Sequence, residues 1–96
     1  MKNINKDKLV EMIRSSDSEI KELGMSILLK NFDLPKELYY TKDSAGHYIY
    51  SWEFSSNSIN SISKEVYLNY LDIFHGKINK SILDAIFKYN EENRKE

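Results

Sequence analysis

Apolar residues recur along the chain with two different periods, and these periods predict the secondary structure. Spacings of three and four residues indicate amphipathic helices, whereas alternation of apolar and polar residues indicates strands. The pattern predicts helices over residues 5–15, 18–31, 64–75 and 80–91, and strands over residues 37–42 and 47–54. The expected order is therefore helix, helix, strand, strand, helix, helix.

The expected helix starts are marked by residues that cap helices. Asn5, Ser63 and Asn79 are the expected N-caps, and Ser16 followed by Glu19 has the spacing of a capping box. Helix 18–31 carries an apolar arc so wide that we expect neighbours on more than one side of it. Its only glycine, Gly24, is expected to permit close packing against one of them.

The two predicted strands form a hairpin around a four-residue turn, 43–46, which contains Gly46. The cross-strand pairs expected from this turn are Lys42 with His47, Tyr40 with Ile49, and Tyr39 with Tyr50. A slip of one residue would exchange the two faces of each strand. The pairing therefore decides which tyrosines point to the core.

Alternation in the second strand places four aromatic residues on one face. They are Tyr48, Tyr50, Trp52 and Phe54. We expect this face to pack on helices 18–31 and 64–75, since a half-buried hairpin needs an apolar face. The alternative is an exposed aromatic patch that binds a protein, stacks bases or holds a ring-shaped ligand. Tyr39 and Tyr40 lie on opposite faces, so the outer one is the first candidate for contact with a partner.

The apolar pattern and the composition together predict a single folded α+β domain spanning residues 1–96. Four helices are expected to pack around one antiparallel hairpin, and the ends at 1–4 and 92–96 are expected to fray. The chain has 41% hydrophobic and 12% aromatic residues, unlike a disordered segment. A net charge of −1 provides no general attraction for nucleic acid or an anionic membrane. The absence of cysteine, of a signal-like N-terminus and of a long apolar run predicts a soluble cytoplasmic protein.

Catalytic motifs are absent from the sequence, so no catalytic, cofactor-binding or metal-binding residues are assigned. A compact enzyme would be centred on His75 with Asp72, or on His47. A histidine at a helix C-terminus is also explained by the helix dipole, which favours its cationic form. Helices 64–75 and 80–91 resemble a helix-turn-helix in spacing, but Asp72 and other acidic residues disfavour DNA binding.

The surplus of tyrosine and the open edges of the hairpin favour a non-enzymatic protein-binding function, as an adaptor or inhibitor. A composition rich in Lys, Asn, Ile and Ser is typical of AT-rich genes, which allows a phage or mobile-element origin and a host defence or regulatory protein as the target. The partner-binding candidates are Tyr39, Tyr40, Tyr48, Tyr50, Trp52, Tyr67 and Tyr70, and the secondary candidates are Lys42, His47, Asp72 and His75.

Two other arrangements stay open from the sequence. A small ligand or nucleotide would stack on Tyr39, Tyr50 and Trp52 at a subunit interface, with Lys42 holding its charge. The hairpin edges or the aromatic face also permit a homodimer.

Overall fold

The computed structural model describes residues 5–74 and 76–93 and shows an α+β fold with four helices, as predicted. The elements are α1 (Lys6–Ile13), α2 (Ser18–Asn31), β1 (Glu37–Lys42), β2 (Tyr48–Ser51), β3 (Asn60–Ser63), α3 (Lys64–Ile73) and α4 (Lys77–Glu92). The sheet differs from the prediction because it has three strands, so the predicted order of elements lacks one strand.

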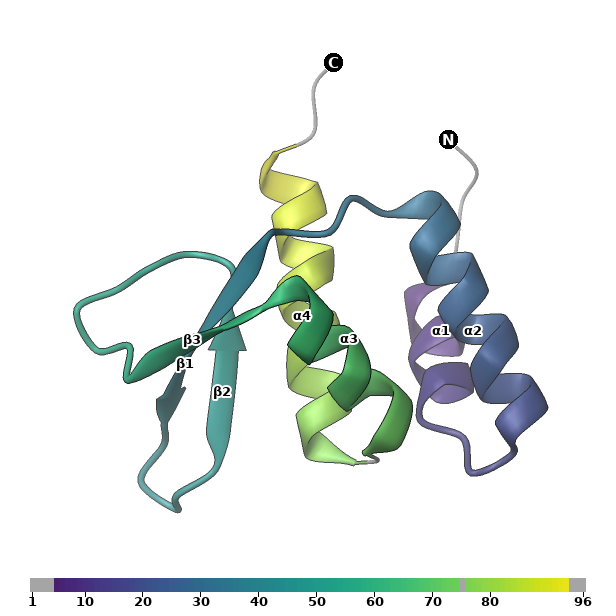
Figure 1. The fold of residues 1–96 in the computed structure, drawn as a ribbon, viewed down its shortest axis with the longest axis horizontal. Helices are drawn as coiled ribbons and strands as arrows, with labels where there is room; N and C mark the ends of the chain where they lie inside the picture. Colours follow the sequence, from purple (N-terminus) through teal and green to yellow (C-terminus); the bar gives the residue numbers. More distant parts are fainter. Residues whose placement is uncertain (1–4, 75, 94–96) are drawn as a thin grey trace.

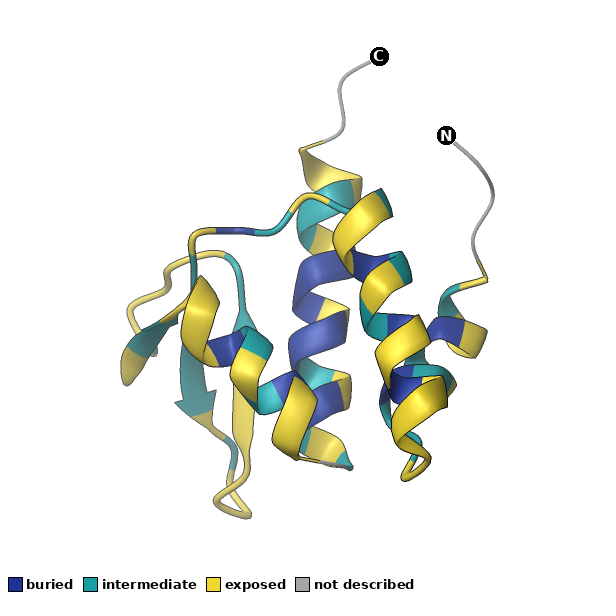
Figure 2. Cartoon of the chain, turned by 45° about the vertical axis from the view of Figure 1, so that its right-hand side comes forward, coloured by how far each residue is buried: buried dark blue, intermediate teal, exposed yellow. Residues whose placement is uncertain are grey.

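The elements form three layers (Figure 1). The sheet lies on one side, α3 and α4 form the middle layer, and the α1–α2 pair lies on the other side. Helix α4 contacts both outer layers through β2 and α1. It is consequently the most deeply buried helix, as its dark segments show (Figure 2).

The additional strand, β3, lies between the predicted strand 47–54 and the predicted helix 64–75, where the sequence pattern predicts no element. The sheet order is β2-β1-β3, with β1 antiparallel to both neighbours. Ile62 lies directly opposite the buried Leu38 and is the only apolar residue in Asn60–Ser63. One apolar residue makes no alternating pattern, so tertiary pairing with β1 rather than local preference explains this strand.

The turn between β1 and β2 is one residue shorter than predicted. The Asp43 N–H donates to the His47 carbonyl (2.9 Å), and the Gly46 N–H donates to the Asp43 carbonyl (3.0 Å). Gly46 has a φ of 87°, which glycine adopts readily. This three-residue turn pairs Lys42 with Tyr48, Tyr40 with Tyr50, and Tyr39 with Ser51, so the predicted register is wrong by one residue.

Side-chain caps start three of the helices. Asn5 and Ser63 cap α1 and α3 as predicted, by accepting from the Lys8 and Val66 N–H groups. The cap of α2 is Asp17 rather than Ser16, with its carboxylate 2.9 Å from the Glu19 nitrogen.

Helix α4 begins earlier than predicted, at Lys77 after Gly76. The predicted cap Asn79 is instead fully buried within the first turn, where its side-chain amide donates to the Leu71 carbonyl (3.1 Å). Asn79 thereby fastens α4 to the end of α3.

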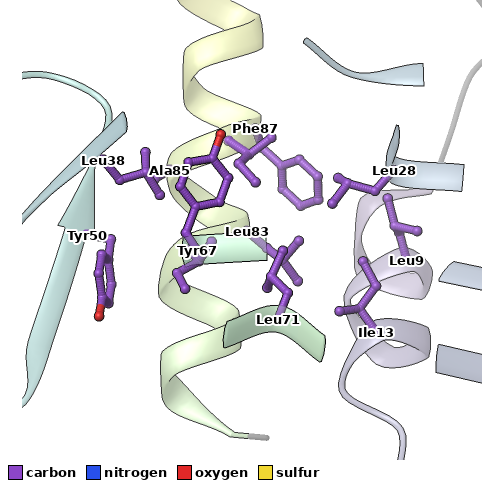
Figure 3. Packing of buried hydrophobic residues seen from close by; sticks show 12 residues of the cluster. Leu9, Ile13, Leu28, Leu38, Tyr50, Tyr67, Leu71, Leu83, Ala85 and Phe87 are labelled. Atoms are coloured by element: carbon purple, nitrogen blue, oxygen red, sulfur yellow. The ribbon is translucent and has the colours of Figure 1, made fainter. Parts of the chain in front are cut away.

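One continuous core joins the three layers (Figure 3). Leu38 and Tyr50 reach it from the sheet, and Leu28 reaches it from α2. The middle layer supplies the largest share, including the fully buried Tyr67 and Ile86. Burial of these side chains is the main source of stability.

Helix α2 packs chiefly on α1 and leaves much of its apolar arc at the surface. Gly24 permits the close approach, since a Cβ there would lie 2.9 Å from Ile13 Cγ1 and from Met12 Cβ. Leu23 and Leu29 stay exposed on the other side. The expectation of neighbours on more than one side is therefore wrong along most of this helix.

Candidate protein-binding surface

The inner face of the sheet, which points toward α3 and α4, holds several predicted binding residues. The Tyr40 ring centroid lies 5.0 Å from that of Tyr48 and 5.6 Å from that of Tyr50. Burial raises the pKa of the Tyr50 phenol to about 12, and the nearby phenols of Tyr70, Tyr40 and Tyr48 act in the same direction. Lys42 Nζ lies 5.7 Å from the Tyr48 ring centroid. This face is largely occupied by its own packing.

Trp52 and Tyr67 also take part in internal packing. The Trp52 ring lies edge-on to Tyr89 of α4, with centroids 5.4 Å apart. Tyr67 is fully buried, and its hydroxyl donates to the Pro35 carbonyl. Tyr67 therefore holds the segment between α2 and β1 against α3.

The opposite face of the sheet is open. We call it the outer face and define it by Glu37, Tyr39, Thr41, Ile49, Ser51, Ser61, Phe54 and Ile59. Within the part of the chain that the structure describes, no helix lies over this face (Figure 1). Ile49, Phe54 and Ile59 are exposed on it, and Tyr39 is half-buried.

An aromatic pair borders a hollow on the outer face. The Tyr39 and Phe54 rings meet edge to face, with centroids 5.5 Å apart and planes at 77°. The hollow has a volume of about 190 Å³ and is lined by Tyr39, Phe54, Ser58, Ile59, Asn60 and Ser61. Small-molecule pockets usually begin at ~300 Å³. The size of this hollow suits a single side chain better.

Phe54 does not lie on the predicted aromatic face with Tyr48, Tyr50 and Trp52. It lies with Tyr39 on the outer face and is 68% exposed, whereas Tyr50 points to the core. The reason is that β2 ends at Ser51, where the Ser51 hydroxyl accepts from the Glu53 N–H (3.1 Å) and the chain bends. Strand alternation therefore no longer holds at Phe54.

A carboxylate is fixed beside the aromatic pair. Glu37 Oε2 accepts from the Tyr39 hydroxyl (3.1 Å), and Glu37 Oε1 accepts from the Ser61 hydroxyl (3.4 Å). The hydrogen bond to Glu37 raises the pKa of Tyr39, since the carboxylate favours the protonated phenol. The outer face thus combines the exposed Phe54 ring and two exposed isoleucines with an oriented negative charge.

Positive charge is sparse on the strands and loops around this face. Residues 43–63 contain no Lys or Arg, although the whole chain has 14. Asp43 and Glu53 are the acidic residues of that stretch. The nearest Lys and Arg residues are Lys42, Lys36 and Lys64. Lys42 lies over Tyr48 on the inner face, and the Lys64 backbone N–H donates to the Lys36 carbonyl where β1 begins.

The sheet edges are less open than the sequence suggests. Strand β1 lies between two neighbours and has no free edge. On β2, the Tyr50 N–H donates to the Ser81 hydroxyl of α4 (2.8 Å). On β3, the Ser61 N–H donates to the Asn60 side chain (2.8 Å). These bonds use backbone N–H groups that an added strand would need. A partner that docks on the face of the sheet does not need them.

The secondary candidates that the structure describes lie in two places, with Lys42 and His47 beside the β1–β2 turn and Asp72 on α3. His47 Nδ1 lies 3.5 Å from Asp43 Oδ2, and the hydrogen bond from the His47 backbone N–H is the main cause of the lowered pKa of Asp43. Asp72 is exposed on α3, near enough to Lys21 to offset part of the pKa lowering that burial causes there. His75 lies outside the described residues. Within residues 5–74 and 76–93, no three His, Asp or Glu side chains gather as metal ligands.

The set predicted for a small ligand is divided between two faces. Tyr39 lies on the outer face, while Tyr50 and Trp52 lie on the inner side, because the register differs by one residue. Tyr39, Tyr50 and Trp52 therefore cannot stack one ring within a single chain.

Sequence reasoning missed Glu37, Phe54 and Ile59 as members of the outer face. Ile59 is an isolated apolar residue in a polar loop, and Phe54 follows a bend that no pattern marks. Glu37 has a visible signal, since it precedes Tyr39 by two residues and so shares its strand face.

Comparisons with known proteins assign this chain to no family. No family model, curated protein or solved structure matches this chain. Among the described residues, no helix has the length and apolar character needed to cross a bilayer.

Proposed function

We propose that this protein is a non-enzymatic protein-binding module, an adaptor or inhibitor, that binds its partner through the outer face of the sheet. The observation that carries the proposal is the exposure of Phe54, Ile49 and Ile59 around Tyr39 on a face that no described helix covers. Aromatic residues are enriched in the cores of protein interfaces. Burial of an exposed ring of this size supplies substantial binding energy.

The charge of the outer face favours a protein over a nucleic acid. Glu37 lies on it, Asp43 and Glu53 lie at its borders, and residues 43–63 supply no Lys or Arg. Nucleic acids are bound mainly through Lys and Arg contacts with phosphates. An anionic polymer is therefore repelled here, while a protein surface is not.

A second exposed apolar surface provides the matched control. Leu23 and Leu29 of α2 are 56% and 51% exposed, close to Phe54 at 68% and Ile59 at 54%. The α2 surface has neither an aromatic pair nor a hollow between rings. Substitutions at the two surfaces therefore remove apolar side chains of similar exposure from two different faces of the protein.

The test is capture of a partner from an extract of the source cell by the immobilised full chain. We expect the Phe54→Ser, Ile59→Ser double variant to retain its fold but to lose binding about 30-fold, as interface hot spots do. The Leu23→Ser, Leu29→Ser variant is expected to bind normally. Loss of the partner only in the α2 variant would overturn the proposal. Circular dichroism confirms that both variants fold.

A further inference from the structure

We infer that the hollow beside Tyr39 receives the Arg or Lys side chain of an apolar, basic segment of the partner protein. This inference rests on the proposed function and specifies the partner's chemistry. Three observations carry it: the exposed aromatic ring, the oriented carboxylate, and the absence of an ion pair to that carboxylate among the described residues.

The rings provide the walls that a long cationic side chain needs. Phe54 is held edge to face against Tyr39 and stays 68% exposed, so much of its ring is free for contact. Arg and Lys bind ring faces through cation–π attraction and pack their aliphatic stems on apolar groups such as Ile59.

Glu37 provides the counter-charge at the edge of the hollow. Each carboxylate oxygen accepts one hydroxyl, from Tyr39 and from Ser61. An ionised carboxylate has about four acceptor positions, so two remain for an incoming donor. The two hydroxyls hold the carboxylate in one orientation, which reduces the entropy lost when a guanidinium or ammonium group binds.

Among the described residues, no Lys or Arg forms an ion pair with Glu37, although Lys36 precedes it and the Lys64 backbone N–H donates to the Lys36 carbonyl (2.8 Å). Lys42 lies on the inner face, and residues 43–63 contain no Lys or Arg. Glu53 adds negative charge in the loop beside Phe54. A cationic segment is thus complementary to this face, whereas an acidic segment is repelled.

The experiment selects ligands from a random peptide library displayed on phage, using the full chain as the target. We expect enriched peptides to combine apolar residues with Arg or Lys and to lose binding to Phe54→Ser. Glu37→Gln keeps the size of the side chain and its ability to bond both hydroxyls, so it tests the charge alone. It should weaken the peptides about tenfold, with Glu22→Gln on α2 as the unaffected control.

A double-mutant cycle then joins the two partners. Replacing the peptide's Arg or Lys by Gln should weaken binding to the wild type but add little to Glu37→Gln, because both changes remove one interaction. Enriched peptides that depend on Phe54 but lack basic residues and ignore Glu37→Gln would overturn the inference and leave the proposed function. Failure to enrich any peptide that depends on Phe54 would overturn both.

Discussion

The hydrogen bond between Tyr39 and Glu37 determines where the negative charge of the outer face lies relative to its aromatic rings. It orients the carboxylate, fixes the Tyr39 ring against Phe54, and involves no residue of the core. A change in this bond should consequently alter the surface without altering the fold.

At this scale, Glu37→Gln should lower the pKa of Tyr39 toward the ordinary value for tyrosine. The carboxylate stabilises the protonated phenol through the hydrogen bond and opposes the phenolate through its charge, and the amide does neither as strongly. NMR titration of the Tyr39 ring signals measures the change. An unchanged Tyr39 pKa in Glu37→Gln would show that the bond does not form in solution.

The two adjacent tyrosines show what the sequence can and cannot predict about single residues. Alternation correctly predicts that Tyr39 and Tyr40 point to opposite faces. Which one faces outward depends on register, and the register depends on a turn closed by Asp43 and Gly46. Both three-residue and four-residue turns fit the same sequence, so pattern alone leaves the choice undecided.

Among the elements, the helices follow their sequence pattern more closely than the strands. Helix α2 has the predicted bounds because its pattern of apolar residues continues over the whole helix and Asp17 caps its start. Strand β3 is not predicted because Ile62 is its only apolar residue, and the pairing of Ile62 with Leu38 of β1 is not visible in the local sequence. The outward position of Phe54 cannot be predicted in the same way, because no sequence pattern marks the bend that follows Ser51.

The α1–α2 contact depends on the absence of a side chain at position 24. Gly24→Ala should destabilise the protein by about 1–3 kcal/mol, because the new Cβ would lie 2.9 Å from Ile13 Cγ1 and Met12 Cβ. Better helix propensity returns only ~1 kcal/mol. Urea unfolding measures the balance, and Ser26→Ala at an exposed position of α2 is the control. A stabilised Gly24→Ala variant would contradict the close packing.

The whole molecule is held together by a middle layer whose two faces are both covered, next to a sheet with one open face. The α+β class with four helices could be predicted from periodicity and composition. The three-layer arrangement could not, because it depends on which apolar faces meet. The position of the outer face follows from that arrangement.

Buried phenols should make the stability of the whole fold sensitive to alkaline pH. The folded pKa values of Tyr50 and Tyr67 lie above the unfolded value, so their contribution is fully present below about pH 10 and falls as pH rises toward the folded pKa. In that pH window, each of the two tyrosines lowers the free energy of unfolding by up to ~1.4 kcal/mol per pH unit.

Tyr50→Phe tests this dependence, since the structure assigns the Tyr50 hydroxyl no hydrogen bond that the substitution would break. The free energy of unfolding should fall less steeply above pH 10 in Tyr50→Phe than in the wild type. Tyr48→Phe, at an exposed ring, should leave the slope unchanged. Equal slopes in all three proteins would contradict the burial of Tyr50.

Site-specific photocrosslinking in the source cell tests the central claim most directly. A photoreactive phenylalanine analogue is placed at Ile49 on the outer face or at Leu29 on α2, which are 49% and 51% exposed in the free protein. We predict a discrete crosslinked protein from position 49 and none from position 29. A crosslinked partner from position 29 alone would contradict binding through the outer face.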